Sequence, residues 1–402
     1  MGKGQCDEKK MARIPGLAVL KVALKVCCMI PVTFSSKLAR SLVYVVLLWN
    51  WIEVIRCTPL PFLPWFSPEL ASTPFRSRVF HVFISLYVWN SAIIRSICAY
   101  LYTTKRGYKI MLELHRFTAA NIQLAPEKTK KRIRNISIVT CSFLISFVLL
   151  NSTGAMSLTL LNPPDMSKTV YFYHNWFAYM GIKVPPFVST LIMVSAQFFM
   201  DSSFVFNCLL LGIAICFAEL FKQLEGEIKS KFENYNDEIE PALRQYDVID
   251  LSDVRRQYLS IAKAVEKLDS ISNFITLSSM STIFFAVLLD IFVLVWNPPL
   301  PPMIYLWVLW LVAGILNLLL YALICSKLSH SSAAVIDTVL MIPNECLEVD
   351  DKTNQQILLF NSLSTSGGHG MSLFGIVIIK KEIVFTVGFF SVCFLLFLAL
   401  FY

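Results

Sequence analysis

Three charged side chains, Arg95, Asp201 and Asp290, stand inside long apolar stretches and are the first candidates for chemistry. A charged group at such a position is costly if it faces lipid, so these residues usually mark a binding site or a transport pathway. Arg95 and Asp201 each follow the start of their stretch by about 15 residues. This predicts that they lie at similar depth and form an intramembrane ion pair. The alternative is that each separately faces water or lipid headgroups.

A second group of residues has the chemistry of a small-molecule site. Trp and Tyr rings offer stacking surface, and Asn and Asp side chains offer hydrogen bonds, which suits a small organic ligand. The alternative for the rings is the interfacial aromatic belt of membrane proteins. A carboxylate at the depth of Asp290 does not belong to such a belt. The candidate pocket residues, expected in the outer halves of their helices, are Asp290, Trp89, Asn90, Tyr87 and Asn151.

The C-terminal stretch carries Phe and Cys side chains at helical spacing. A pore lined by such residues would be a hydrophobic constriction that gates by dewetting. The alternative is that the rings face lipid or neighbouring helices. Lys380 and Lys381 precede the stretch and would lie at the inner mouth of the pore. The candidate pore and gate residues are Phe390, Cys393, Phe394, Phe397 and Phe401.

The composition places these residues in an all-α polytopic membrane protein. The chain is 56% hydrophobic and 15% charged, whereas soluble domains average about 25% charged residues. The net charge of +8 is concentrated between the apolar stretches, where it reports orientation. We therefore expect contact with membrane lipids and no nucleic-acid partner.

Seven apolar stretches are long enough to cross a bilayer as helices, because about 20 residues span its hydrocarbon core. Basic residues concentrate before the first stretch and in the second and fourth intervening segments. By the positive-inside rule the N-terminus is cytoplasmic and the C-terminus extracellular, which is the inverse of a G-protein-coupled receptor. The expected spans are 36–56, 80–102, 136–160, 186–218, 273–296, 303–325 and 380–402.

The domain organisation follows from these spans. Residues 1–35 are expected to form a cytoplasmic segment with an amphipathic helix, because Lys21 and Lys25 interrupt its apolar run. Residues 36–402 are expected to form one transmembrane receptor or channel domain, whose last helix, 380–402, is the pore helix.

The helical apolar pattern also continues past the membrane, through Phe217, Phe221, Leu224 and Ile228. Helices four to six are therefore expected to extend into the cytosol, because an apolar stripe there must be buried against another helix or subunit. The alternative is a local intracellular hairpin. The expected cytoplasmic anchor comprises residues 219–272 and 326–370.

The motifs of catalysis and cofactor binding are missing from the sequence. It has no nucleophile–base constellation, no P-loop, no HExxH zinc motif and no Cys/His cluster with metal-ligand spacing. We expect no enzyme activity, no cofactor and no metal.

The chain resembles the arthropod gustatory receptors, whose superfamily includes the insect odorant receptors. The architecture agrees over the whole chain, and the C-terminal segment agrees in spacing. Met371–Gly375 matches the family's approach to the last helix, Lys380 its basic position, and Gly388 its glycine. Val392-Cys393 and Ala399-Leu400 replace the family's Thr-Tyr and Gln-Phe, which makes the chain a divergent member.

The resemblance implies a plasma-membrane taste receptor that acts as a ligand-gated, non-selective cation channel. A small organic tastant would bind between the outer helix halves and open a pore lined by the last helix. Other receptor subunits would complete a homo- or heterotetramer. The residues leave two alternatives open: a secondary transporter with Arg95 and Asp201 as its midplane site, and a non-conducting membrane scaffold.

Overall fold

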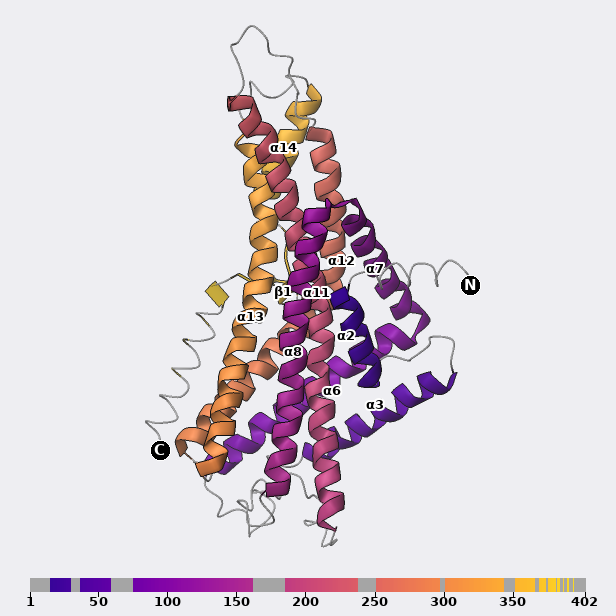
Figure 1. The fold of residues 1–402 in the computed structure, drawn as a ribbon, viewed down its shortest axis with the longest axis vertical. Coiled ribbons are helices and arrows are strands. Elements are labelled where there is room, and N and C mark those ends of the chain that lie inside the picture. Colours follow the sequence, from indigo (N-terminus) through magenta and orange to yellow (C-terminus); the bar gives the residue numbers. More distant parts are fainter. Residues whose placement is uncertain are drawn as a thin grey trace.

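The computed structural model describes most of the chain as helices (Figure 1). The described residues are 15–29, 37–58, 75–161, 185–237, 251–296, 301–342, 351–365, 369–373 and 375–380, with 382, 383, 386, 389 and 393 beyond them. Nine helices lie within these residues: α2 (Pro15–Val26), α3 (Lys37–Cys57), α6 (Phe75–Thr103), α7 (Lys105–Leu124), α8 (Glu127–Leu161), α11 (Pro186–Asp237), α12 (Leu251–Trp296), α13 (Pro301–Leu340) and α14 (Asp351–Thr365). The antiparallel strands β1 (Ser372–Leu373) and β2 (Val377–Ile378) form a hairpin.

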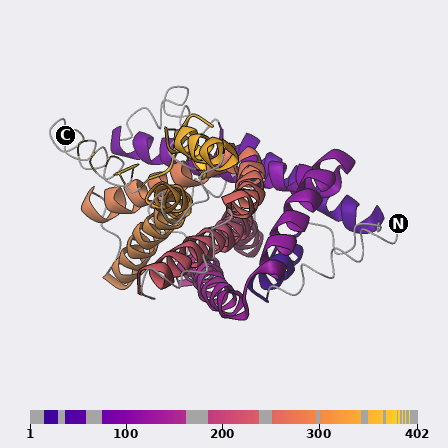
Figure 2. The ribbon, with the colours of Figure 1, turned by 90° about the horizontal axis from the view of Figure 1, so that it is seen from above.

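Three long helices form the tall axis of the molecule in Figure 1. Helix α11 has 52 residues, α12 has 46 and α13 has 40. At 1.5 Å per residue, α11 is about 78 Å long, more than twice the thickness of a bilayer core. The extended helices expected for the fourth to sixth stretches are therefore present. Seen along the axis, α3 and α6 cross this bundle obliquely (Figure 2).

The protein is a multi-pass membrane protein. Four helical stretches of the described residues are long and apolar enough to cross a bilayer: Lys37–Ile55, Ser202–Ser230, Leu251–Leu288 and Leu311–Leu340. The remaining spans, the total of seven and the orientation stay predictions.

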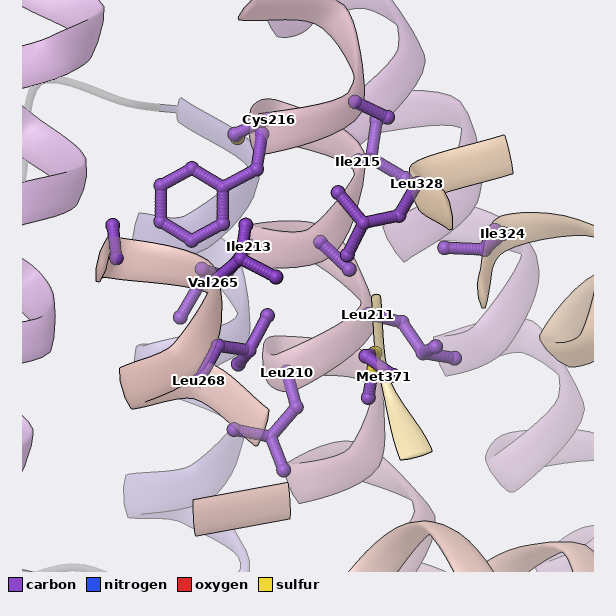
Figure 3. Close-up of a cluster of buried hydrophobic side chains, with 14 of the residues drawn as sticks. Leu210, Leu211, Ile213, Ile215, Cys216, Val265, Leu268, Ile324, Leu328 and Met371 are labelled. Carbon is purple, nitrogen blue, oxygen red and sulfur yellow. The ribbon is translucent and has the colours of Figure 1, made fainter. Parts of the chain in front are cut away.

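The apolar core lies between α11, α12 and α13 (Figure 3). The middle of α11 is buried on every side from Ser202 to Phe221, which is the environment that a helix apolar all round requires. Met371, just before β1, points into this core beside Leu211 of α11 (Figure 3). The segment before the last span is therefore anchored in the centre of the bundle.

Helix α7 is an element that the sequence reasoning treated as part of a basic loop. Thr104 caps its N-terminus by accepting a hydrogen bond from the amide of Gly107 at 3.0 Å. Its buried face includes Met111, Leu114 and Ile122, which contact the bundle. The many basic residues of the segment concealed this apolar periodicity.

Other boundaries also moved. Helix α8 begins at Glu127, well before the span expected from residue 136. Helix α2 lies within residues 1–35, and the cytoplasmic amphipathic segment expected there stays a prediction. The β1–β2 hairpin was not expected, because two-residue strands leave almost no periodic signal in a sequence.

Candidate functional site

Arg95 is buried where α6 meets α11. Its Nη1 donates a hydrogen bond to Ser202 Oγ, and its Nη2 donates to the carbonyl oxygen of Cys27 at 3.4 Å. Ser202 directly follows Asp201 in α11. Residue counting predicts that Arg95 and Asp201 lie at similar depth, and Arg95 contacts the residue that follows Asp201. The Asp201 side chain lies outside the described residues, so the ion pair itself stays a prediction.

Further hydrogen bonds at this depth connect α6, α12 and α13. Ser278 of α12 donates to Asn90 Oδ1 of α6 at 3.1 Å. Tyr321 of α13 donates to Thr276 Oγ1 of α12 at 3.2 Å. Together with the Arg95–Ser202 contact, these bonds form a polar layer across four helices. We call the following residues the polar layer: Asn90, Arg95, Ser202, Thr276, Ser278 and Tyr321.

Sequence reasoning missed four of the six residues of this layer. Ser202, Thr276, Ser278 and Tyr321 carry no charge and were passed over. The available signal was the cluster of hydroxyl residues in 276–282, which is unusual inside an apolar stretch. Such side chains commonly hydrogen-bond between helices in membranes.

Two buried asparagines lie close to the polar layer in sequence. Asn207 of α11 and Asn317 of α13 are both 2% exposed. Neither amide atom of the Asn207 side chain, nor Nδ2 of Asn317, has a hydrogen-bond partner among the described residues. Buried polar groups normally have partners, and α11 packs against α13. These amides are therefore candidates for hydrogen bonds to a bound molecule.

The predicted pocket residues of α6 face different neighbours. The Tyr87 ring lies against Phe204 of α11, with centroids 6.4 Å apart. Asn90 meets α12 through Ser278. Trp89 is turned toward α3, where its Nε1 donates to Thr58 Oγ1 at 3.1 Å. The three side chains do not converge on one point.

Asp290 is buried in α12, as a functional carboxylate would be. It is 12 residues beyond Ser278, the partner of Asn90, or about 18 Å along the helix. Asp290 and Asn90 therefore lie at different depths along the bundle. Asn151 lies in α8, but its side chain is outside the described residues. The single pocket made of all five residues stays a prediction.

The hairpin before the last span is tied to α12 and α13. The backbone amide of Ser372 donates to Asp269 Oδ1 at 2.6 Å, and its hydroxyl contacts both carboxylate oxygens of Asp269 at 2.9 and 2.8 Å. The amide of His369 donates to Ser332 Oγ at 3.0 Å. Gly370 lies so close to α13 that an added Cβ would be 3.0 Å from that of Ser329.

Of the predicted pore residues, only Cys393 lies within the described part of the chain, and it is exposed. Phe390, Phe394, Phe397 and Phe401 lie outside it. Their role in a pore or gate stays a prediction.

A buried carboxylate joins three helices on the side expected to face the cytosol. The Glu219 side chain of α11 is 2% exposed, and its Oε2 lies 2.9 Å from Arg132 Nε of α8. Lys327 of α13 donates a hydrogen bond to the other oxygen of the same carboxylate. Glu219 and Lys327 lie within the expected anchor, and Arg132 of α8 lies outside it. This three-residue ion cluster holds α8, α11 and α13 together.

Burial changes the titration of groups in the part of the bundle that is expected to face the cytosol. Burial lowers the pKa of His115 in α7 well below its usual range, and the charge of Lys21 lowers it further. Burial also lowers the pKa of His369, and the neighbouring Glu266 partly opposes that effect. Glu113 accepts a hydrogen bond from Lys267 of α12 at 2.8 Å, which lowers the pKa of the carboxyl group.

The whole architecture matches that of known receptor structures. An insect olfactory receptor from Machilis hrabei in complex with eugenol superposes with a TM-score of 0.72 at 12% identity, covering 98% of this chain and 100% of the receptor. The chain has the fold of an insect olfactory receptor. A second structure of that receptor gives a TM-score of 0.63 at 12% identity, over 95% of this chain and 96% of the receptor. No family model and no curated protein sequence matches the chain.

Proposed function

We propose that this protein is a chemosensory receptor of the gustatory kind that works as a ligand-gated, non-selective cation channel in the plasma membrane. The observation that carries the proposal is the end-to-end agreement of its fold with an insect olfactory receptor. The C-terminal approach, Met371–Gly375 with Lys380, favours the gustatory branch through its resemblance to that family.

The ligand in this proposal is a small organic molecule with both ring and polar groups. The neighbouring receptor was solved with eugenol, a small substituted phenol. In this chain the polar layer provides hydroxyl groups, Asn207 provides both amide atoms, and Asn317 provides Nδ2, none of these amide atoms having a described partner. The hydroxyl group of a phenol or alcohol could hydrogen-bond to either amide, with apolar side chains of the same helix against its ring.

Binding would reach the pore through α12. Thr276 and Ser278 of the polar layer are on the same helix as Asp269, which holds the hairpin before the last span. A ligand that binds one packing arrangement of α12 better than another would shift α12 toward that arrangement. Because α12 holds the hairpin, this shift would also move the start of the last span.

Assembly with further receptor subunits is supported by apolar side chains on the cytoplasmic helices. Met341, just past α13, is 78% exposed, and Leu358 of α14 is 67% exposed. Large apolar side chains beyond the membrane are rarely left in water when they are grouped. A second copy, or a related subunit, is the partner we propose for this surface.

The decisive experiment is a current recording from cells that express the chain alone, with a panel of small aromatic and polar ligands that includes eugenol. The proposal expects a ligand-evoked cation current. Phe397→Ala should change its open probability, and Asn317→Leu should shift the ligand concentration for half-maximal current. Leu340→Ala, on the exposed side of α13, is the control for Asn317→Leu and should leave that concentration unchanged.

The transporter alternative predicts a different result in the same cells. A secondary transporter would give saturable ligand uptake without conductance, and Arg95→Gln would abolish it. In the structure the Arg95 guanidinium already bonds to Ser202 and to a backbone carbonyl. This observation favours a structural role for Arg95 over an open substrate site. Uptake without current would overturn the channel proposal.

A further inference from the structure

The expected cytoplasmic ends of α3 and α6 are joined by a direct contact. Tyr44 of α3 donates a hydrogen bond to Thr103 Oγ1 at the end of α6, with 3.0 Å between the oxygens. Helix α7 begins two residues later, at Lys105. Figure 1 shows α3 and α7 on the same side of the long helices. Three helix ends therefore meet around one contact.

Basic side chains surround this contact. Lys37 and Arg40 lie two turns and one turn before Tyr44, on the same face of α3. Lys105 and Arg106 follow Thr103 directly, and Lys109 lies one turn further along α7. All are exposed except Arg40, which is half-buried. We call the following residues the basic cluster: Lys37, Arg40, Lys105, Arg106 and Lys109.

The positive charges of the basic cluster lie near the N-termini of α3 and α7, where they are electrostatically unfavourable for the helices. A helix N-terminus carries partial positive charge, so acidic residues are favoured there and basic residues are disfavoured. Neither α3 nor α7 has an acidic residue in its first turn. The single acid of α7, Glu113, is bound to Lys267 of α12. An anion beside Lys105, Arg106 and Lys109 would therefore relieve repulsion at the start of α7.

Exposed apolar surface lies next to the basic cluster. Leu38 is 82% exposed and Val45 is 62% exposed, both on α3. Tyr100, one turn before Thr103 on α6, is also exposed. A cluster of cations at the end of a membrane span, beside apolar surface that continues along the span, matches both parts of a lipid: charged headgroup and acyl chain.

We propose that the basic cluster binds an anionic phospholipid of the cytoplasmic leaflet. The headgroup contacts the cluster, and an acyl chain lies along Leu38 and Val45. The site is independent of the proposed channel activity, because it requires only the membrane position of α3 and α6. A soluble anion would use the charges but gain nothing from the apolar surface.

The test compares two variants that each lose two positive charges. Lys105→Gln/Arg106→Gln removes charges from the basic cluster. Lys128→Gln/Lys131→Gln is the matched control, because both lysines are exposed on the first turns of α8, about 8 to 12 Å before residue 136, where that span is expected to begin. The full chain is purified into nanodiscs of phosphatidylcholine containing spin-labelled phosphatidylserine, and the immobilised fraction of label is measured.

The proposal expects wild type and the control to hold phosphatidylserine in preference to phosphatidylcholine. The test variant should hold it about 25-fold less well, from a contribution of about fivefold for each of the two charges. Equal losses in the test and control variants would show only a general attraction to basic residues, and would overturn the proposal. Glycerophosphoserine has the headgroup without acyl chains. If it displaced the spin-labelled lipid at a concentration equal to that of the lipid, the proposal would also be overturned.

Two further measurements guard against a folding artefact. The thermal unfolding temperature in pure phosphatidylcholine should be the same for wild type and the test variant, because no lipid charge is present there. Lys37→Gln/Lys109→Gln removes two other charges of the basic cluster from two separate helices. It should reproduce the loss, and a normal preference for phosphatidylserine in this variant would contradict the site.

Discussion

Asp269 of α12 holds Ser372 by both its backbone amide and its hydroxyl group. One carboxylate thereby fixes the start of the hairpin that precedes the last span. The same hairpin carries Met371 and Ile379, both fully buried, with the Ile379 amide bonded to the Met371 carbonyl at 2.9 Å. Any movement of α12 near Asp269 must therefore move the hairpin that precedes the last span, or break these bonds.

Asp269→Ala should destabilise the protein by about 1–3 kcal/mol, because the buried amide of Ser372 loses its acceptor. Ser372→Ala removes only the hydroxyl bonds and should cost about 1 kcal/mol. Thermal unfolding of both variants and of the double variant would give the coupling energy. Additive losses would show that the two residues do not act through each other.

Glu219→Gln should also destabilise the protein, by about 2–4 kcal/mol, because Arg132 and Lys327 lose the buried charge that they share. Glu127→Gln is the control. Its carboxylate pairs with Lys130 at 2.9 Å but is 89% exposed, so its loss should be under about 1 kcal/mol. Equal effects in denaturant unfolding would mean that the Glu219 cluster does not hold the three helices.

Gly107→Ala should severely disturb the junction of α6 and α7. A Cβ at this position would lie 2.5 Å from the Tyr100 carbonyl oxygen and 2.7 Å from Leu101 Cα, and backbone atoms cannot move aside cheaply. Gly226→Ala is the opposite case, since nothing lies within 4 Å of the added methyl group. That change, inside helix α11, should stabilise the protein by about 0.5–1 kcal/mol. Expression level and unfolding temperature would distinguish the two.

Acid should weaken the packing of α7 through His115. Burial holds the pKa of this side chain well below its ordinary value of 6.5. Below pH 6.5 the unfolded chain therefore binds more protons than the folded one, and the free energy of unfolding falls as the pH drops. The slope approaches about 1.4 kcal/mol per pH unit for one such group. Above pH 6.5 both states are neutral at His115, so the effect is absent.

His115→Leu should flatten this pH dependence between pH 6.5 and 5, measured by thermal unfolding. It should cost little at pH 7.5, because neither ring nitrogen of His115 has a hydrogen-bond partner among the described residues. His330→Gln, an exposed position on α13, should leave the slope unchanged. An unaltered slope in His115→Leu would assign the acid sensitivity to another group.

Much of the architecture could be predicted from the sequence because it depends on local pattern. The expected first span, 36–56, is within one residue of α3, and the continuation of the apolar pattern past Phe221 correctly indicated that α11 is long. Helix α7 was missed because its apolar face, Met111 and Leu114 among others, is embedded in a strongly basic segment.

The sites were predicted less completely, because they depend on contacts between distant residues. Residue counting predicted similar depths for Arg95 and Asp201, and in the structure Arg95 contacts Ser202, the residue after Asp201. It could not assign the direction of side chains around α6, where Trp89 faces α3 and Asn90 faces α12. That direction is set by helix rotation and tilt, which local spacing leaves open.

The sequence by itself determined that this is a membrane protein of long helices, because hydropathy and helical period are properties of neighbouring residues. Only the tertiary structure decided that Asp269 holds Ser372, 103 residues away, and that Glu219 joins α8 to α13. These contacts depend on how the helices pack, and packing is decided by the whole bundle at once. The sequence showed a resemblance to the chemoreceptors in architecture and C-terminal spacing, but at 12% identity only the three-dimensional comparison showed the end-to-end agreement with the receptor fold.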